Sequence, residues 1–194
     1  MKKFTICTAV LLATLTACSK TEPLPSERKV SSVKVNLDLA TPDKALKSYW
    51  AVRDSVRSKQ VELFAQNKEG YQSAEAQMSE VADGALAKNF SFDIIPFETF
   101  SRDLIDVKVE SESRAVIIAV IKNSTPIPAG AEMSKYDEER RRDGERYRYI
   151  LEKNQAGWRV SEVWEWSTYP SAEWKKTKPD DGKPHVPSLT YNGI

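Results

Sequence analysis

Cysteine and histidine are nearly absent from this sequence of 194 residues, and their scarcity excludes many kinds of active site. The two cysteines are Cys7 and Cys18, and the one histidine is His185, which lies in a proline-rich stretch near the C-terminus. The chain after Cys18 therefore offers no disulfide, no thiolate ligand and no cysteine nucleophile. Ser-His-Asp and Cys-His arrangements and His-rich zinc sites are likewise excluded from the core.

An excess of charge of either sign is also missing. The chain has 29 Lys and Arg against 28 Asp and Glu, which gives a formal net charge of +1. Nucleic-acid binding would call for a basic stripe with interleaved aromatic residues, so we expect no nucleic-acid partner. No pattern of ligand residues indicates a metal, and we expect no cofactor.

The first eighteen residues have the layout of a bacterial secretory signal. Lys2 and Lys3 supply the positive region, and the apolar run 4–15 is too short to span a bilayer as a mature helix. The stretch Leu15-Thr16-Ala17-Cys18 resembles the lipobox of bacterial lipoproteins. The resemblance implies that residues 1–17 are removed and that Cys18 carries several acyl chains, which hold stably where one chain holds only marginally.

The residues after Cys18 predict the localisation of the protein. Ser19 rather than Asp follows the cysteine, which by analogy with lipoprotein sorting favours the outer membrane, with the chain facing the periplasm. Residues 18–39 contain Pro23, Pro25 and several serines, a composition typical of a flexible tether. The alternative interpretation of Cys18 is an incidental cysteine beside a conventional cleavage site.

Helical periodicity begins at residues 41–43, Thr-Pro-Asp, a typical helix start. An apolar stripe follows, which we expect to be buried in the core. The stripe consists of Ala45, Leu46, Tyr49, Trp50, Val52 and Val56. We expect Val61 and Phe64 to continue the helical region, Asn67 and Gly70 to break it, and a further helix to run over 73–87.

The spacing changes from residue 89, and strands are expected from there. A short strand is predicted over 90–95, and 105–109 alternates apolar and charged residues as a strand with one solvated face does. The run 115–121 is apolar on both faces, which indicates a central strand covered on both sides. The range 124–130 reads as a loop, and the charged range 132–143 as a short exposed helix or a long hairpin tip.

Residues 145–166 predict a β-hairpin whose register follows from its pairs. Placing Lys153 opposite Trp158 segregates apolar pairs from opposite-charge pairs. The other predicted pairs are Leu151 with Val160, Glu152 with Arg159, Tyr147 with Trp164 and Arg146 with Glu165.

Helices followed by antiparallel strands predict the α+β class. The opening 41–50, the strand pair in 105–121 and the closing Gly157-Trp158-Arg159-Val160 are similar to the NTF2-like superfamily, and more narrowly to small bacterial lipoproteins of that class. The resemblance spans 40–168 and implies a single domain in which helices pack on a curved antiparallel sheet to form a cone. A proline-rich tail, 169–194, would follow.

The resemblance and the aromatic residues together suggest what the domain does. We expect that the protein is not an enzyme. We expect a membrane-anchored binding or adaptor module for an envelope protein or a small apolar ligand. The alternatives are an immunity or inhibitor lipoprotein against a toxin or hydrolase, and an isomerase-like enzyme with a carboxylate facing a tyrosine hydroxyl. A homodimer through the sheet also stays open.

Aromatic side chains are the candidate site residues. They would line a pocket or, alternatively, complete the core. The candidate pocket residues are Tyr49, Trp50, Phe92, Tyr147, Trp158 and Trp164, and the candidate partner contacts are Trp166 and Trp174.

Overall fold

The computed structural model describes residues 35–65, 68–88, 98–177 and 189–191, all within the unit Ser32–Ile194. The helices are α1 (Pro42–Ser58), α2 (Gln60–Ala65), α3 (Lys68–Val81), α4 (Ala85–Lys88) and α5 (Lys135–Asp143). The strands are β1 (Phe100–Ser111), β2 (Arg114–Asn123), β3 (Ala131–Met133), β4 (Glu145–Asn154), β5 (Gly157–Ser167), β6 (Glu173–Lys176) and β7 (Leu189–Tyr191).

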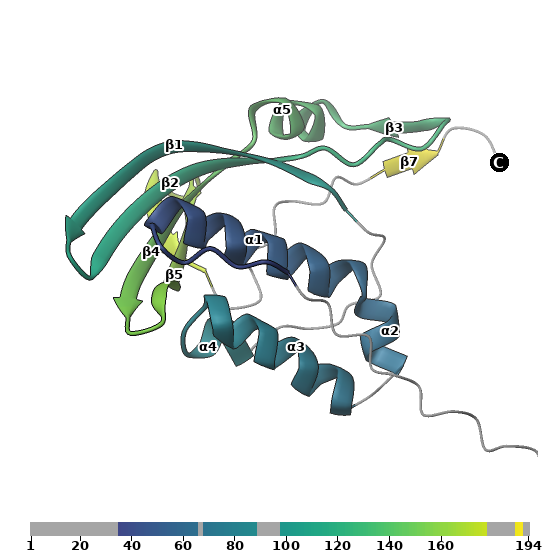
Figure 1. The fold of residues 1–194 in the computed structure, drawn as a ribbon. Helices are drawn as coiled ribbons and strands as arrows, with labels where there is room; N and C mark the ends of the chain where they lie inside the picture. The colour runs from purple at the N-terminus through teal and green to yellow at the C-terminus, as the bar shows by residue number, and fades with distance from the viewer. Residues whose placement is uncertain (1–34, 66–67, 89–97, 178–188, 192–194) are drawn as a thin grey trace, which may run out of the picture. The chain divides into compact units, whose positions relative to one another are not determined.

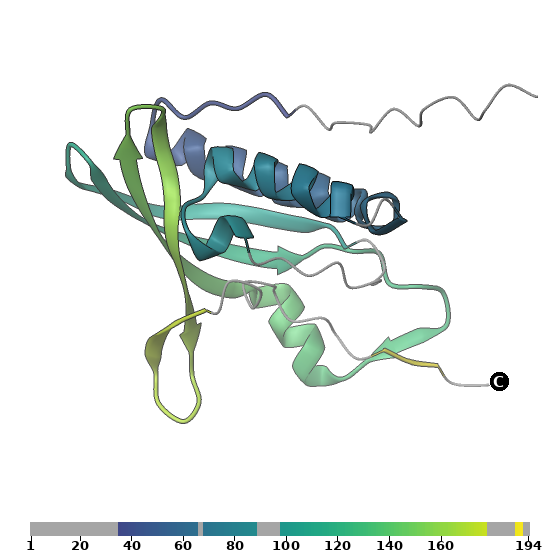
Figure 2. The same cartoon turned by 90° about the horizontal axis from the view of Figure 1, so that it is seen from below.

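The fold is α+β, as the sequence predicts. Five strands pair antiparallel in the order β1-β2-β4-β5-β6, and β3 pairs separately with β7. Helices α1 and α3 contact each other, and both contact strands of the larger sheet, on the side over which β1 and β2 curve (Figures 1 and 2). None of the described helices is long and apolar enough to cross a membrane.

Helix α1 confirms the predicted start and the predicted stripe. Thr41 has extended backbone angles at the N-cap, Pro42 occupies the first turn, and Asp43 complements the positive end of the helix dipole. All six residues of the apolar stripe are buried in the core. The sequence therefore determines which side of α1 packs on the sheet.

The predicted break at Gly70 is wrong, because the described part of α3 starts at Lys68 and runs through this glycine. A Cβ atom at Gly70 would collide with the backbone of Leu63, so glycine serves close helix packing here. The helix also ends earlier than predicted. It stops at Val81 because the next residue, Ala82, forms a parallel bridge with Val160 of β5.

Strand β2 is central, as predicted, with β1 on one side and β4 on the other. Its core-facing residues Ala115, Ile117, Ala119 and Ile121 are buried, whereas the residues between them are half-buried. The prediction for β1 is wrong in one respect. Ile105, Val107 and Val109 are 57%, 42% and 58% exposed, because β1 is the edge strand of the described sheet and carries a bulge between Leu104 and Asp106.

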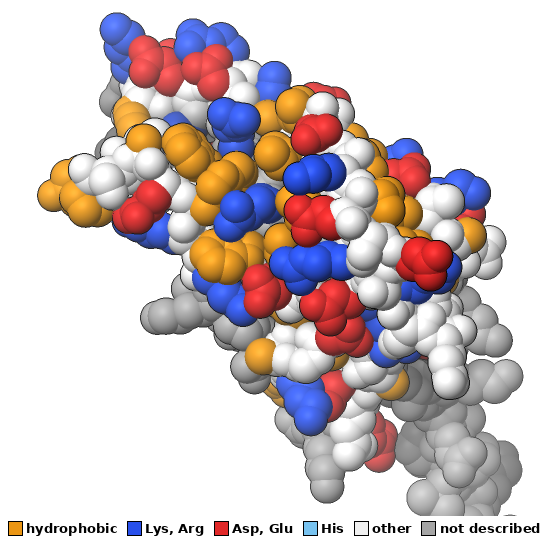
Figure 3. All heavy atoms as spheres, turned by 90° about the vertical axis from the view of Figure 1, so that its left-hand side faces the viewer, with side chains coloured by type: hydrophobic (Ala, Val, Ile, Leu, Met, Phe, Trp, Pro, Cys, Tyr) orange, Lys and Arg blue, Asp and Glu red, His pale blue; other side chains and the backbone are white. Residues whose placement is uncertain are grey.

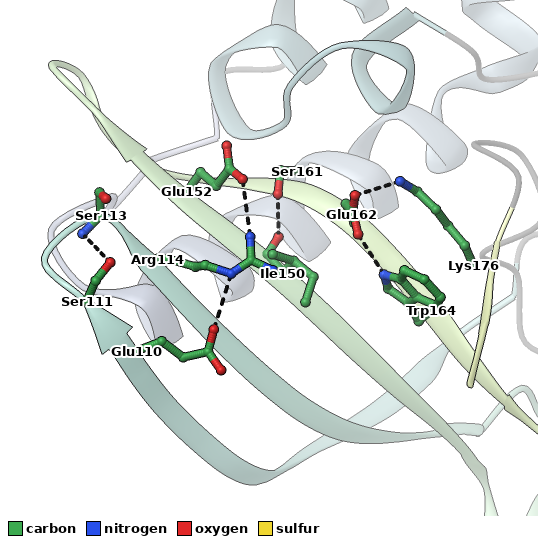
Figure 4. A network of polar contacts seen from close by, with 10 residues as sticks. All are labelled: Glu110, Ser111, Ser113, Arg114, Ile150, Glu152, Ser161, Glu162, Trp164 and Lys176. Atoms are coloured by element: carbon green, nitrogen blue, oxygen red, sulfur yellow. Dashed lines mark hydrogen bonds and ion pairs between the residues drawn. The ribbon is translucent and has the colours of Figure 1, made fainter. Parts of the chain in front are cut away.

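The β4–β5 hairpin follows the predicted register only as far as Leu151 opposite Val160. A bulge follows, where the Ser161 hydroxyl donates to the Ile150 carbonyl (3.2 Å), and the pairing slips by one residue (Figure 4). The predicted pairs of Tyr147 with Trp164 and of Arg146 with Glu165 are therefore wrong. Tyr147 pairs with Glu165, and Arg148 pairs with Trp164. Tyr147 is fully buried, while Trp164 points to the opposite face.

The ends of the predicted domain also differ from the prediction. Residues 35–39 are not a free tether, because Val35, Leu37 and Leu39 pack against the core and the Trp158 N–H donates to the Leu39 carbonyl (3.0 Å). The proline-rich tail contributes β6 at an edge of the sheet, a position that is consistent with its prolines. The strand predicted over 90–95 lies outside the described residues.

The predicted range 132–143 is not a hairpin tip, because Glu132 and Met133 end strand β3 and the residues from Lys135 onward form helix α5. The Ser134 hydroxyl caps it by accepting from the Asp137 N–H (3.1 Å). Gly144 ends it with a positive φ of 78°.

The outer face of the sheet, opposite the helices, carries a ladder of polar contacts rather than a continuous apolar surface. Glu110 and Glu152 accept from Arg114, and Glu162 accepts from Trp164 Nε1 (2.8 Å) and from Lys176 Nζ (2.6 Å) (Figure 4). On the side of the molecule drawn in Figure 3, hydrophobic side chains are interspersed with charged ones.

Glu162→Gln should show a stability loss that depends on pH. The hydrogen bond from Lys176, followed by that from Trp164, lowers the pKa of Glu162 below its ordinary value of 4.5. The stabilisation is thus present above that value and fades as the pH falls through the folded-state pKa. For this partly exposed pair we expect a loss of about 0.5 kcal/mol at pH 7 and almost none at pH 3, measured by urea denaturation.

Glu152→Gln is the matched control for this prediction, since Glu152 is more exposed and its contact with Arg114 is longer, at 3.4 Å. Its effect at pH 7 should be smaller. An equal loss at both pH values for Glu162→Gln would contradict the assignment.

Candidate functional site

A small hollow lies between α1 and strands β1, β2 and β4. Its lining residues are Trp50, Arg53, Asp54, Arg57, Phe100, Arg102, Ile121 and Tyr149. The space inside is sufficient for about one water molecule. Most of the lining residues come from one helix and one strand, and each set shows the spacing of its element. Those of α1 follow helical spacing, and those of β1 are two apart.

Local structure explains why these side chains meet. The α1 residues of the lining lie along one side of the helix, at the border of its buried stripe. Phe100 and Arg102 share one face of β1, and Arg102 pairs across the sheet with Ile121, which is buried. Both faces are therefore turned toward the same space.

Arg102 is held by an ion pair and by two aromatic rings. Its two Nη atoms donate to the two carboxylate oxygens of Asp54 at 2.6 and 2.7 Å. Its guanidinium lies over the rings of Trp50 and Phe100, at 5.5 Å from each centroid. The Nε atom is buried and has no hydrogen-bond partner among the described residues. Arg102 thus lines the hollow while keeping one buried donor without a partner among the described residues.

The aromatic wall of the hollow is fixed by hydrogen bonds. Trp50 Nε1 donates to the Tyr149 hydroxyl (3.1 Å), and Arg53 donates to the Tyr49 hydroxyl (3.1 Å). Burial raises the pKa of Tyr149, so its hydroxyl stays protonated. Arg53 is therefore paired with Tyr49, and Trp50 with Tyr149.

Arg57 is different. Its guanidinium lies over the Phe100 ring at 5.3 Å, and within the described residues it makes no hydrogen bond and no ion pair. Burial lowers its pKa, and repulsion from Arg53 lowers it further, whereas the charge of Glu98 acts in the opposite direction. Glu98 itself accepts from the Asn123 amide (2.9 Å). Arg57 is a half-buried cation with unused donors.

The electrostatics of the hollow favour an anion. Three guanidinium groups line it, against the single carboxylate of Asp54, which Arg102 already engages on both oxygens. A cation that is partly desolvated and close to other cations gains most from an anionic partner. The arrangement can therefore bind and orient a negatively charged group.

A carboxylate facing a tyrosine hydroxyl, the feature expected of an isomerase-like enzyme, occurs elsewhere in the domain. The Tyr147 hydroxyl donates to Glu145 Oε2 (2.9 Å), and Arg140 pairs with the other oxygen of Glu145. Neither Tyr147 nor Glu145 lines the hollow. Across the described part of the chain, no group of three or more His, Cys, Asp or Glu could hold a metal ion.

The predicted pocket residues separate into several environments. Trp50 lines the hollow, whereas Tyr49, Tyr147 and Trp158 are buried in the core. Trp164 lies on the outer face beside Arg148, whose guanidinium is 4.8 Å from its ring centroid. The slipped register therefore prevents Trp164 from sharing a pocket with Tyr147.

The predicted partner contacts, Trp166 and Trp174, lie opposite each other on β5 and β6 and pack edge to face at 5.2 Å. Phe92 and Cys18 lie outside the described residues.

The arginines of the hollow were not predicted from the sequence. A signal was present, because Arg53 and Arg57 are four residues apart beside the apolar stripe of α1, and Arg102 stands between Phe100 and Leu104 in a strand. The sequence does not show that these two segments face each other.

No protein-family model, no curated protein and no solved structure matches the chain.

Proposed function

We propose that this chain is a lipoprotein of the bacterial outer membrane that binds a protein partner in the periplasm and catalyses no reaction. Support for the anchor comes from the lipobox-like stretch ending in Cys18. Support for binding comes from one observation above all. Arg57 lines an open hollow and makes no hydrogen bond or ion pair within the described residues.

A protein partner fits the hollow better than the small apolar ligand that the sequence suggested. The lining is cationic, and the space holds about one water molecule, too little for the body of an apolar ligand. The NTF2-like cone belongs to the same proposal. It is supported by the helices packed on one face of an antiparallel sheet, an arrangement that other α+β folds share.

A second candidate is an immunity or inhibitor lipoprotein, which would present an exposed aromatic loop to a toxin or hydrolase. The loop between β5 and β6 has this property, because Tyr169 is 84% exposed. This function differs from a general adaptor in requiring tight binding to a single protein, with contacts that include this loop.

Site-specific photo-crosslinking in living cells tests the proposal. The full chain carries p-benzoylphenylalanine at Ser58, which is exposed and adjacent to Arg57, and we expect one adduct of defined mass after irradiation. The matched control is the same residue at Gln155, in the exposed turn of the β4–β5 hairpin. The absence of an adduct at Ser58, or identical adducts at both positions, would argue against binding at the hollow.

A further inference from the structure

The N–H donors of Arg57 that have no partner among the described residues indicate which chemical group could bind there. A guanidinium presents a planar fork of N–H groups, and a carboxylate accepts two of them in parallel. The hollow already contains one such pair, since Arg102 and Asp54 are joined by two hydrogen bonds. Arg57 has the same fork, held over Phe100. The charges of Glu98 and Asp54 act on it, but it is not hydrogen-bonded to a carboxylate among the described residues.

The buried Nε of Arg102 is a second observation that fits a ligand, although Arg148 and Arg159 also have an Nε without a partner among the described residues and do not line the hollow. Buried side-chain donors in proteins are nearly always hydrogen-bonded, and one left unpaired costs stability. The Nε of Arg102 has no partner among the described residues, although both Nη atoms of Arg102 donate to Asp54. An oxygen atom of a ligand, or of a water that bridges to it, would satisfy this donor.

The size of the hollow limits what enters. Room for about one water admits no more than an oxygen at the tip of a side chain, while the rest of the ligand stays outside. Phe100 and Ile121 supply apolar surface beside the arginines. A short methylene stem that ends in a carboxylate matches this combination of apolar and cationic surface.

We infer that the hollow binds the carboxylate of an acidic peptide segment, with Arg57 donating two hydrogen bonds to it. The inference rests on the proposed function, because it names the chemistry by which the partner protein is recognised. Asp, Glu or a chain terminus supplies this group. A ligand that stays largely outside the hollow makes further contacts with the surface, as a peptide does and a small acid does not.

Fluorescence titration of the lipidated full chain in detergent tests the inference, because Trp50, one of five tryptophans in the chain, lines the hollow and its emission should change on occupation. The probes are the capped peptides Ac-GGEEGG-amide and Ac-GGQQGG-amide, sodium acetate and inorganic phosphate. We expect saturable binding of the Glu peptide and at least tenfold weaker binding of the Gln peptide and of acetate. Phosphate binding as tight as that of the Glu peptide would overturn the carboxylate assignment. Equal binding of acetate would overturn the peptide assignment.

Variants at Arg57 separate the fork from its charge. Arg57→Gln should lower the affinity for the Glu peptide at least tenfold. Arg57→Lys should lower it less, because lysine keeps the charge but loses the paired donors. Arg142→Gln is the matched control, since Arg142 is exposed on α5 and pairs with its neighbour Asp143. Unchanged binding by Arg57→Gln, with a melting curve like that of the parent chain, would overturn the inference.

The crosslink at Ser58 distinguishes this inference from the proposed function. If the adduct persists in the Arg57→Gln background, a partner binds near the hollow without a carboxylate bound to Arg57. The inference then fails, while the proposed function stands. If the parent chain gives no adduct, the proposed function itself fails. Loss of the adduct only in Arg57→Gln supports both.

Discussion

Gly144→Ala should destabilise the domain by about 3 kcal/mol or more, from backbone strain and overpacking together. Gly144 has φ 78° and ψ 178°, a combination that is essentially restricted to glycine. An added Cβ would lie 2.7 Å from side-chain carbons of Val120 and Lys122 and 2.9 Å from the Ile121 carbonyl oxygen. The strand that carries these atoms is central in the sheet, so it cannot move aside without disturbing its neighbours.

Chemical denaturation of the two purified chains at pH 7 would measure this loss. Gly130→Ala provides the matched control, because Gly130 has a nearly identical φ of 77° but no atom within 4 Å of an added Cβ. Its cost should be limited to the backbone preference, about 1 kcal/mol. Similar losses in both variants would show that the contact with β2 contributes nothing.

Cys18→Ser should move the protein almost completely from the membrane fraction to the soluble periplasmic fraction. Membrane affinity grows by about 0.8 kcal/mol for each buried methylene group, so several acyl chains bind stably and their loss leaves nothing comparable. Among the described residues no helix could replace them by crossing the bilayer. The folded domain should be unaffected, since the sequence after Cys18 has no thiol.

Immunoblotting of separated membrane and soluble fractions is the measurement, and Cys7→Ser is the control. Cys7 lies inside the predicted signal, so its replacement should leave the protein in the membrane. Retention of Cys18→Ser in the outer membrane would mean that Cys18 is not the anchor.

Local periodicity predicted the parts of the fold that one segment determines by itself. The stripe on α1 and the pairs nearest the turn of the β4–β5 hairpin agree with the structure, because both depend on neighbours a few residues away. The bulge beside Ser161 does not appear in the pattern of apolar residues. It exchanges the faces of every residue beyond it, and Trp164 is therefore misplaced.

The hollow was beyond prediction for a different reason. Arg57 and Arg102 are brought together by the packing of α1 against β1, and this contact depends on the pairing of the whole sheet. A single sequence shows that each arginine borders an apolar face. It does not show which faces meet, and Gly70 illustrates the same limit, because its closeness to Leu63 depends on how two helices approach.

The bond between the Trp158 N–H and the Leu39 carbonyl has a mechanical consequence. The chain enters the domain beside the first turn of α1, whereas Arg57 stands in the last turn, about 22 Å farther along the helix axis. In the proposed tethered protein, a pull from the lipid end would first load the contacts of residues 35–39, which include the hydrogen bonds of Asp38 with Ser48 of α1 and of Leu39 with Trp158 of β5. These contacts lie nearer the start of α1 than Arg57 does, so this part of the domain would bear the tension.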